Sequence, residues 1–143
     1  MYYTDSDGQK KLPYIIHRTS LGCYERTLAY LIEEYAGALP TWLMPTQVKI
    51  LPISERQHDY AKQVYAQLHA AGIRVEVDAR NEKIGYKIRE AQNEKIPYML
   101  VVGDKEVENG TVSVRARKDG DLGAMAADAF RAKILDEIAT KAR

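Results

Sequence analysis

After Pro45 the chain alternates between short apolar runs and segments of helical periodicity, and this order restricts the fold more than any other feature of the sequence. In chain order, the predicted elements are a strand at 47–53, a helix at 55–71, a strand at 73–77, a helix at about 84–93 and a strand at 98–102. Tyr60, Val64 and Leu68 fall on one face of the first helix, as in an amphipathic helix. The alternation predicts an α/β fold in which helices flank a mixed β-sheet.

The end of the chain is predicted to contain a hairpin and a closing helix. Asn109 and Gly110 readily adopt positive φ, which favours a tight turn between strands at 105–107 and 111–115. The closing helix is expected from about 124 to 140.

The beginning of the chain is predicted to form a separate hairpin and helix. Residues 2–4 and 14–16 are strand-like, and the segment between them opens with a turn signal at 5–8. A helix is expected over 24–35, followed by Gly37. Its apolar residues recur at helical spacing and form one stripe: Leu28, Leu31, Ile32 and Tyr35.

The segment 38–45 contains two prolines and is interpreted as a linker that packs against the protein. We therefore expect two parts, 1–44 and 45–143. The length of 143 residues allows one domain with an additional piece and a genuine core.

Composition limits the classes of partner. The formal net charge of +1 excludes a polybasic chain that holds nucleic acid by counterion release alone, so RNA binding would need a local cluster of basic residues. Cys23 is the only cysteine, and no signal segment opens the chain, so a cytoplasmic location is expected. The apolar runs are shorter than the roughly 20 residues needed to cross a bilayer, so no membrane association is expected.

The segment 80–90 combines amide, guanidinium and carboxylate groups directly after a predicted strand. Such groups on a rigid strand-to-helix junction can match the edges of unstacked RNA bases. The alternative interpretation is a solvated helix that carries Glu–Lys pairs.

Several strings resemble a known family. Residues 13–37, with Gly22, Glu25 and Arg26 as the diagnostic part, look like the third signature motif of class II aminoacyl-tRNA synthetases. Four strings are similar to the anticodon-binding domain of threonyl-tRNA synthetases: 40–43, 80–90, 97–108 and 112–115.

The resemblance implies a C-terminal fragment: the end of a class II catalytic core followed by a class IIa anticodon-binding domain. Arg26 would contact ATP in the intact enzyme, and His17 would be one of three zinc ligands. The first two class II motifs and the other two zinc ligands do not appear in this chain, so we expect no aminoacylation by it alone. Zinc, ATP and magnesium are expected only in the intact enzyme. The alternatives are a solvated arginine at 26 and a partly exposed strand histidine at 17.

The resemblance also implies an anticodon site made of Asn81, Arg89, Glu106 and Arg115, with Glu106 and Arg115 on the two strands of the hairpin. The expected partner is the anticodon stem-loop of tRNA(Thr). Phosphate contacts are weaker candidates, and their alternative role is solubilising surface charge: Lys83, Lys87 and Arg117.

Two other functions remain open. The chain could be one piece of a split or oligomeric threonine-tRNA ligase, or an accessory protein that uses the same fold to bind another partner. The apolar stripe of the predicted helix 24–35 would be exposed in the chain alone, which favours self-association.

Overall fold

The structure is a computed structural model that describes residues 1–18 and 22–142. It divides into two compact units, Met1–Tyr30 and Leu31–Arg143.

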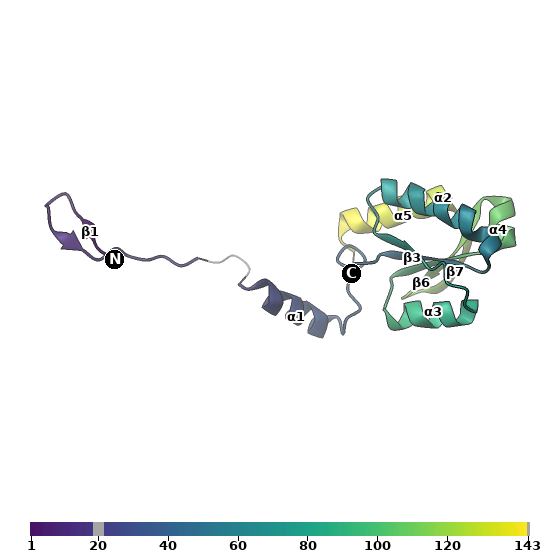
Figure 1. Ribbon diagram of the computed structural model, residues 1–143, viewed down its shortest axis with the longest axis horizontal. Coiled ribbons are helices and arrows are strands. Elements are labelled where there is room, and N and C mark those ends of the chain that lie inside the picture. The colour runs from purple at the N-terminus through teal and green to yellow at the C-terminus, as the bar shows by residue number, and fades with distance from the viewer. Residues whose placement is uncertain (19–21, 143) are drawn as a thin grey trace. The chain divides into compact units, whose positions relative to one another are not determined.

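The second unit is built on a five-stranded sheet with the strand order β4-β3-β5-β6-β7 (Figure 1). The strands are β3 (Val48–Pro52), β4 (Val75–Val77), β5 (Tyr98–Val102), β6 (Thr111–Ala116) and β7 (Gly120–Ala126). β3 pairs in parallel with β4 and β5, whereas β6 pairs antiparallel with both β5 and β7. The predicted mixed sheet is confirmed.

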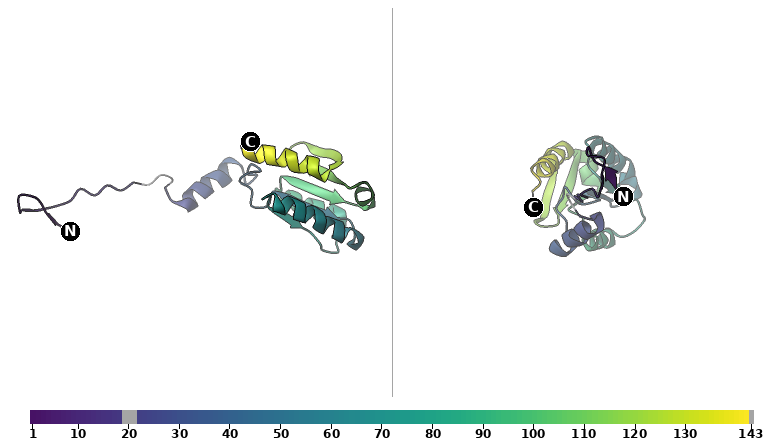
Figure 2. Two further views of the ribbon diagram at one scale, coloured as in Figure 1. Left: turned by 90° about the horizontal axis from the view of Figure 1, so that it is seen from above. Right: turned by 90° about the vertical axis from the view of Figure 1, so that its left-hand side faces the viewer.

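Helices cover the two faces of this sheet unequally. The helices of the unit are η1 (Glu55–Gln57), α2 (His58–Ala70), α3 (Ile84–Asn93), α4 (Asp104–Asn109) and α5 (Ala127–Thr140). α2 and α5 lie side by side on one face, and α3 lies on the other (Figures 1 and 2). The main core lies under α2 and α5, and it includes Ile50, Leu100 and Phe130.

The core under α3 is smaller and does not extend across the whole sheet. Leu51 of β3 and Met99 of β5 pack there with Ala91 and Ile88 of α3. Along β6, buried and half-buried residues alternate, with Val112 and Val114 in the main core. The side chains that alternate with them point to the face that carries α3, and they are only half-buried. The β6–β7 part of that face is therefore open.

The predicted hairpin at 105–115 is wrong. Residues 104–109 form the helix α4, because the Glu106 carboxylate accepts a hydrogen bond from the Gly103 amide at 2.9 Å and caps the first turn. Gly110 does adopt positive φ (65°), but it ends α4 instead of joining two strands.

The actual hairpin joins β6 to β7, and β7 was not predicted. Its sequence contains Gly120 and Gly123, both with positive φ, and glycine is depleted in strands. The pairing is irregular between Val114 and Arg115, where the register shifts. Because residues 124–126 belong to β7, α5 begins three residues later than expected, at Ala127.

The first unit contains a short hairpin, but with a different second strand from the predicted one. β1 (Tyr3–Thr4) pairs antiparallel with β2 (Lys10–Lys11) across a turn in which the Gly8 amide donates to the Asp5 carbonyl at 2.9 Å. The expected second strand at 14–16 is irregular and exposed.

The predicted helix 24–35 is confirmed as α1 (Tyr24–Glu34). None of its residues is buried, and Leu28 and Ile32 are about half exposed. Among the described residues, no helix is both long enough and apolar enough to span a membrane.

Substitution of Phe130 tests how much the main core contributes to the free energy of unfolding. Its side chain is 0% exposed and makes an edge-to-face contact with Tyr98, with ring centroids 5.4 Å apart. Phe130→Ala should lower the free energy of unfolding by about 3–5 kcal/mol in urea titrations, because it removes buried surface and leaves a cavity. The control Leu135→Ala, at a partly exposed position of the same helix, should change it by about 1 kcal/mol or less. Equal losses in the two variants would contradict this assignment of the core.

Candidate nucleic-acid interface

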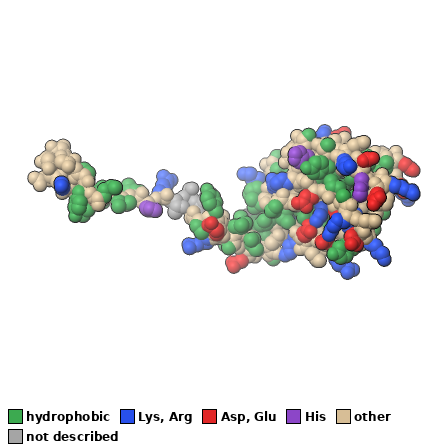
Figure 3. Space-filling model, in the orientation of Figure 1, with side chains coloured by type: hydrophobic (Ala, Val, Ile, Leu, Met, Phe, Trp, Pro, Cys, Tyr) green, Lys and Arg blue, Asp and Glu red, His purple; other side chains and the backbone are tan. Residues whose placement is uncertain are grey.

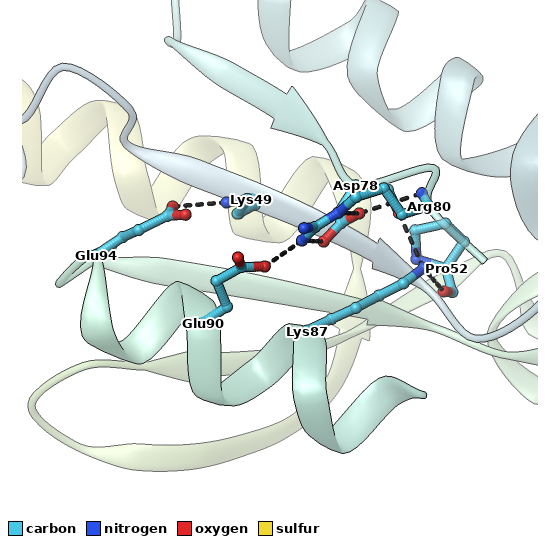
Figure 4. A network of polar contacts seen from close by, with 7 residues as sticks. All are labelled: Lys49, Pro52, Asp78, Arg80, Lys87, Glu90 and Glu94. Carbon is cyan, nitrogen blue, oxygen red and sulfur yellow. Dashed lines mark hydrogen bonds and ion pairs between the residues drawn. The ribbon is translucent and has the colours of Figure 1, made fainter. Parts of the chain in front are cut away.

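Asp78 organises the connection between β4 and α3 (Figure 4). Its side chain is 2% exposed, and its carboxylate accepts hydrogen bonds from Arg80 at the backbone amide (3.2 Å), Nε (2.9 Å) and Nη2 (2.6 Å). Hydrogen bonds from Arg80 hold the pKa of Asp78 below its ordinary value, although burial opposes the shift. The loop that carries Asn81 is therefore fixed at its start.

Arg80 extends this network to α3. Its guanidinium also pairs with the Glu90 carboxylate, and the hydrogen bonds to Asp78 and Glu90 raise the pKa of Arg80. Beside them, Lys49 Nζ lies 2.6 Å from Glu94 Oε2 (Figure 4). These cations are paired with carboxylates of the protein, so Arg80 is not a free donor of the segment 80–90.

The structure does not support the prediction that Lys87 contacts a phosphate. The residue is 2% exposed, and its Nζ donates to the Pro52 carbonyl at 3.1 Å and to the Asp78 carbonyl at 3.0 Å. Burial lowers the pKa of Lys87, partly opposed by the Asp78 charge. Lys87 therefore ties the ends of β3 and β4 to α3 and does not face a ligand.

The structure likewise does not support the prediction that Arg117 contacts a phosphate. Its guanidinium donates to the Lys95 carbonyl at 2.6 Å and to the Leu39 carbonyl at 2.8 Å. Burial lowers the pKa of Arg117. Because its donors are used by the main chain, it is not available for a phosphate in this structure.

Glu106 lies in α4, not on a hairpin strand. One carboxylate oxygen caps that helix through the Gly103 amide, and the side chain is half-buried. The structure therefore gives Glu106 a structural role that the sequence interpretation did not include.

The remaining candidates are accessible. Asn81, Lys83 and Arg89 are exposed on the β4–α3 connection and α3, and none has a hydrogen-bonding or ionic partner for its side chain among the described residues. Arg115 projects from the open face of β6, with its side chain 39% exposed. Its Nη2 lies 3.3 Å from the Asp121 carboxylate, so most of the guanidinium donors remain free.

The strand register places Arg115 on the face of the sheet that carries α3. Arg115 is directly opposite Met99 on β5, and Met99 packs in the small core with Ile88 of α3. Arg89 is an exposed residue of that helix. On the molecular face shown in Figure 3, Lys and Arg side chains lie among Asp and Glu and do not form one continuous basic surface.

The predicted ATP contact Arg26 and the predicted zinc ligand His17 belong to the first unit, as does the single cysteine, Cys23. His17, Cys23 and Arg26 are exposed, and the Arg26 amide contacts Cys23 Sγ at 3.4 Å. Within residues 1–18 and 22–142, no three His, Cys, Asp or Glu side chains are grouped so that they could hold a metal. Among the described residues, His17 therefore has no companion ligands for a metal.

The structural roles of Asp78 and buried Lys87 were not predicted from the sequence. For Lys87, the helical spacing contained a signal of burial. Lys87 occurs at the helical spacing of Ile84, Ile88 and Ala91, which all face the sheet. A lysine within an apolar stripe can be interpreted as a buried hydrogen-bond donor when strands end nearby and leave main-chain carbonyls unpaired.

Lys87→Met tests this donor role. The substitution leaves two buried carbonyls without their donor and should lower the free energy of unfolding by about 1–3 kcal/mol in urea titrations. Lys83→Met, at an exposed position nearby, should change it by about 0.5 kcal/mol or less. If Lys87→Met left the free energy of unfolding unchanged, the donor role of Lys87 would be contradicted.

The Asp78 network should also make stability depend on pH. Because the pKa of Asp78 is depressed below 3.8 in the folded state, its contribution is present above the unfolded value and is lost as the pH falls through the folded value. The stability difference between the wild type and Asp78→Asn should therefore be largest above about pH 5 and shrink below about pH 3. Asp59→Asn, at an exposed position, should show no such change. A difference for Asp78→Asn that stays constant with pH would count against the network.

Comparisons with known proteins identify the second unit. The family described as Anticodon binding domain (HGTP_anticodon) matches residues 47–137. The chain is 62% identical over 143 residues to the threonine--tRNA ligase of Clostridium botulinum strain Eklund 17B, covering 100% of this chain and 22% of that protein. It is 61% identical over 140 residues to the threonine--tRNA ligase of Caldanaerobacter subterraneus subsp. tengcongensis, covering 98% of this chain and 22% of that protein. The chain thus spans about a fifth of the length of these relatives.

Solved structures agree with this identification. The RNA binding domain of threonyl-tRNA synthetase from Cryptosporidium parvum Iowa II superimposes with a TM-score of 0.75 and 35% identity, covering 78% of this chain and 28% of that one. Prolyl-tRNA synthetase from the same genus and species gives a TM-score of 0.64 and 26% identity, covering 72% of this chain and 23% of that one. Since the family match begins directly before β3 and ends within α5, it includes the whole five-stranded sheet, and the chain belongs to the anticodon-binding domain family.

Proposed function

We propose that the unit Leu31–Arg143 binds the anticodon stem-loop of tRNA(Thr), as part of a threonine-tRNA ligase. The observation that carries this proposal is that Arg115 on the open face of β6, Arg89 on α3 and Asn81 on the β4–α3 connection are accessible and retain donors that the fold does not use. The two similar bacterial proteins are both threonine--tRNA ligases, which supports the choice of tRNA.

Each proposed contact follows from the chemistry of its side chain. Arg115 presents a guanidinium from a rigid strand, and Asn81 presents an amide that can both donate and accept. Unstacked bases need such groups at separate positions on a rigid support. Arg89 and Lys83 are suited to carbonyl or phosphate oxygens. Glu106 can accept from a base only with a carboxylate oxygen that the Gly103 amide leaves free.

The charge of the chain favours contacts with bases over a large phosphate footprint. The net charge is +1, and several cations around α3 are already paired with carboxylates. Few phosphates can then be neutralised, so the dependence of affinity on salt should be shallow. Sequence selectivity would come mainly from the exposed readers.

We further propose that aminoacylation requires protein beyond this chain, and that the chain functions in the cytoplasm. The Arg26 and His17 positions would take part in ATP and zinc binding only within a complete catalytic site. The exposed apolar residues of α1 would support self-association of the chain alone.

The central test is fluorescence anisotropy of a labelled tRNA(Thr) anticodon stem-loop titrated with the chain. Arg115→Ala should weaken binding by about 1–3 kcal/mol, roughly 5- to 150-fold, because it removes a direct contact. The control Arg131→Ala removes a surface arginine that pairs with Asp128 within α5, and it should leave the affinity unchanged.

A second stem-loop with altered anticodon bases completes this experiment. The wild type should bind it more weakly, and Arg115→Ala should reduce the difference between the two loops. Equal binding of both loops by the wild type would contradict anticodon reading by this chain.

A further inference from the structure

Residues 38–44, here called the strap, end three residues before β3 and form no helix or strand. They are nevertheless packed like a core element, since Leu39, Thr41 and Met44 are buried. The strap makes no strand pairing, so its buried carbonyls need donors from elsewhere.

Arg117 supplies the donors at the first end of the strap. Its Nη2 donates to the Ala38 carbonyl at 3.1 Å and to the Leu39 carbonyl at 2.8 Å. The backbone amide of Arg117 donates to the Pro97 carbonyl at 2.8 Å, which fixes the position of this arginine at the end of β6.

Arg74 and Gln47 supply the donors at the second end. Arg74 donates to the Met44 carbonyl through Nε (3.0 Å) and Nη2 (2.8 Å), and Nη2 also reaches the Trp42 carbonyl at 2.9 Å. Gln47 Nε2 donates to the Thr41 carbonyl at 2.9 Å. Both residues directly precede strands of the sheet.

Glu137 of α5 holds the middle of the strap. Its Oε1 accepts from the Thr41 hydroxyl at 2.5 Å, and its Oε2 accepts from the Tyr98 hydroxyl at 2.6 Å. The hydrogen bond from Tyr98 links the strap to β5 through a single carboxylate.

We infer that hydrogen bonds to Arg74, Arg117 and Glu137 hold the strap in place. Residues 38–44 are then a fixed part of the anticodon-binding unit and not a flexible linker. Directly before the strap, Ala36 and Gly37 turn with φ of 47° and 76°, and the Ala36 carbonyl accepts a hydrogen bond from Lys95 Nζ. The inference is independent of RNA binding, and it gives Arg117 a role distinct from a phosphate contact.

Trp42 provides a direct probe, because it is the only tryptophan of the chain and lies within the strap. Its indole Nε1 is buried, and Lys141 Nζ lies 5.6 Å from the ring centroid. The experiment measures acrylamide quenching of Trp42 fluorescence in the full chain, for the wild type, Arg117→Met and the surface control Arg131→Met. Only Arg117→Met should show increased quenching and a red-shifted emission.

Hydrogen exchange provides a second readout on the same proteins. The Leu43 and Met44 amides donate to the Pro40 carbonyl at 2.9 and 3.0 Å, so their exchange reports opening of the strap. In Arg117→Met their exchange should be faster by on the order of tenfold, while the amides of β3 and β5 keep their protection. Unchanged quenching and exchange would overturn the inference.

Thr41→Val covers the case in which Arg117→Met fails to fold. This nearly isosteric change removes only the hydroxyl bonded to Glu137. It should increase Trp42 quenching and strap exchange without lowering protection in the sheet. If the strap and the sheet lost protection together in both variants, the strap would not be a separate docked segment, and the inference would be wrong.

Discussion

The structure of the second unit depends on hydrogen bonds that lysine and arginine side chains donate to buried main-chain carbonyls. These bonds lie at the two ends of the sheet. At the carboxyl ends of the parallel strands β3 and β4, Lys87 donates to Pro52 and Asp78. At the opposite end, Arg74 and Arg117 donate to the strap. An unpaired buried carbonyl costs about as much as a lost hydrogen bond, so these cations have a structural function.

This constraint separates two kinds of basic residue that have the same appearance in the sequence. Lys87 and Arg117 are committed to carbonyls, and Arg80 is committed to carboxylates. Arg115 projects from the open face of β6 and Arg89 is exposed on α3, and both retain available donors. The surface proposed for RNA is thus defined by the donors that folding leaves unused, and not by the total number of basic residues.

Periodicity was sufficient to predict β3, α2, β4, α3 and β5, because each has a clear apolar pattern. It also predicted β6 and most of α5, but it failed at 104–110 and at 120–126, for local reasons. The Asn-Gly pair was correctly expected to turn, but a glutamate at the third position of α4 caps a helix there. The glycines of β7 concealed a strand that is stabilised by its pairing with β6. The resemblance to threonyl-tRNA synthetases correctly indicated the family, whereas burial of Lys87 and the strap contacts of Arg117 depend on residues distant in sequence.

The most direct test of this separation is amide chemical-shift mapping by NMR of the isotopically labelled chain during titration with the tRNA(Thr) anticodon stem-loop. The account predicts the largest shift changes at residues 79–83, around Arg89 on α3 and around Arg115 on β6. Residues 38–44 and Arg117 should change little. Largest changes at the strap and Arg117, with none on the open face of β6, would contradict the account.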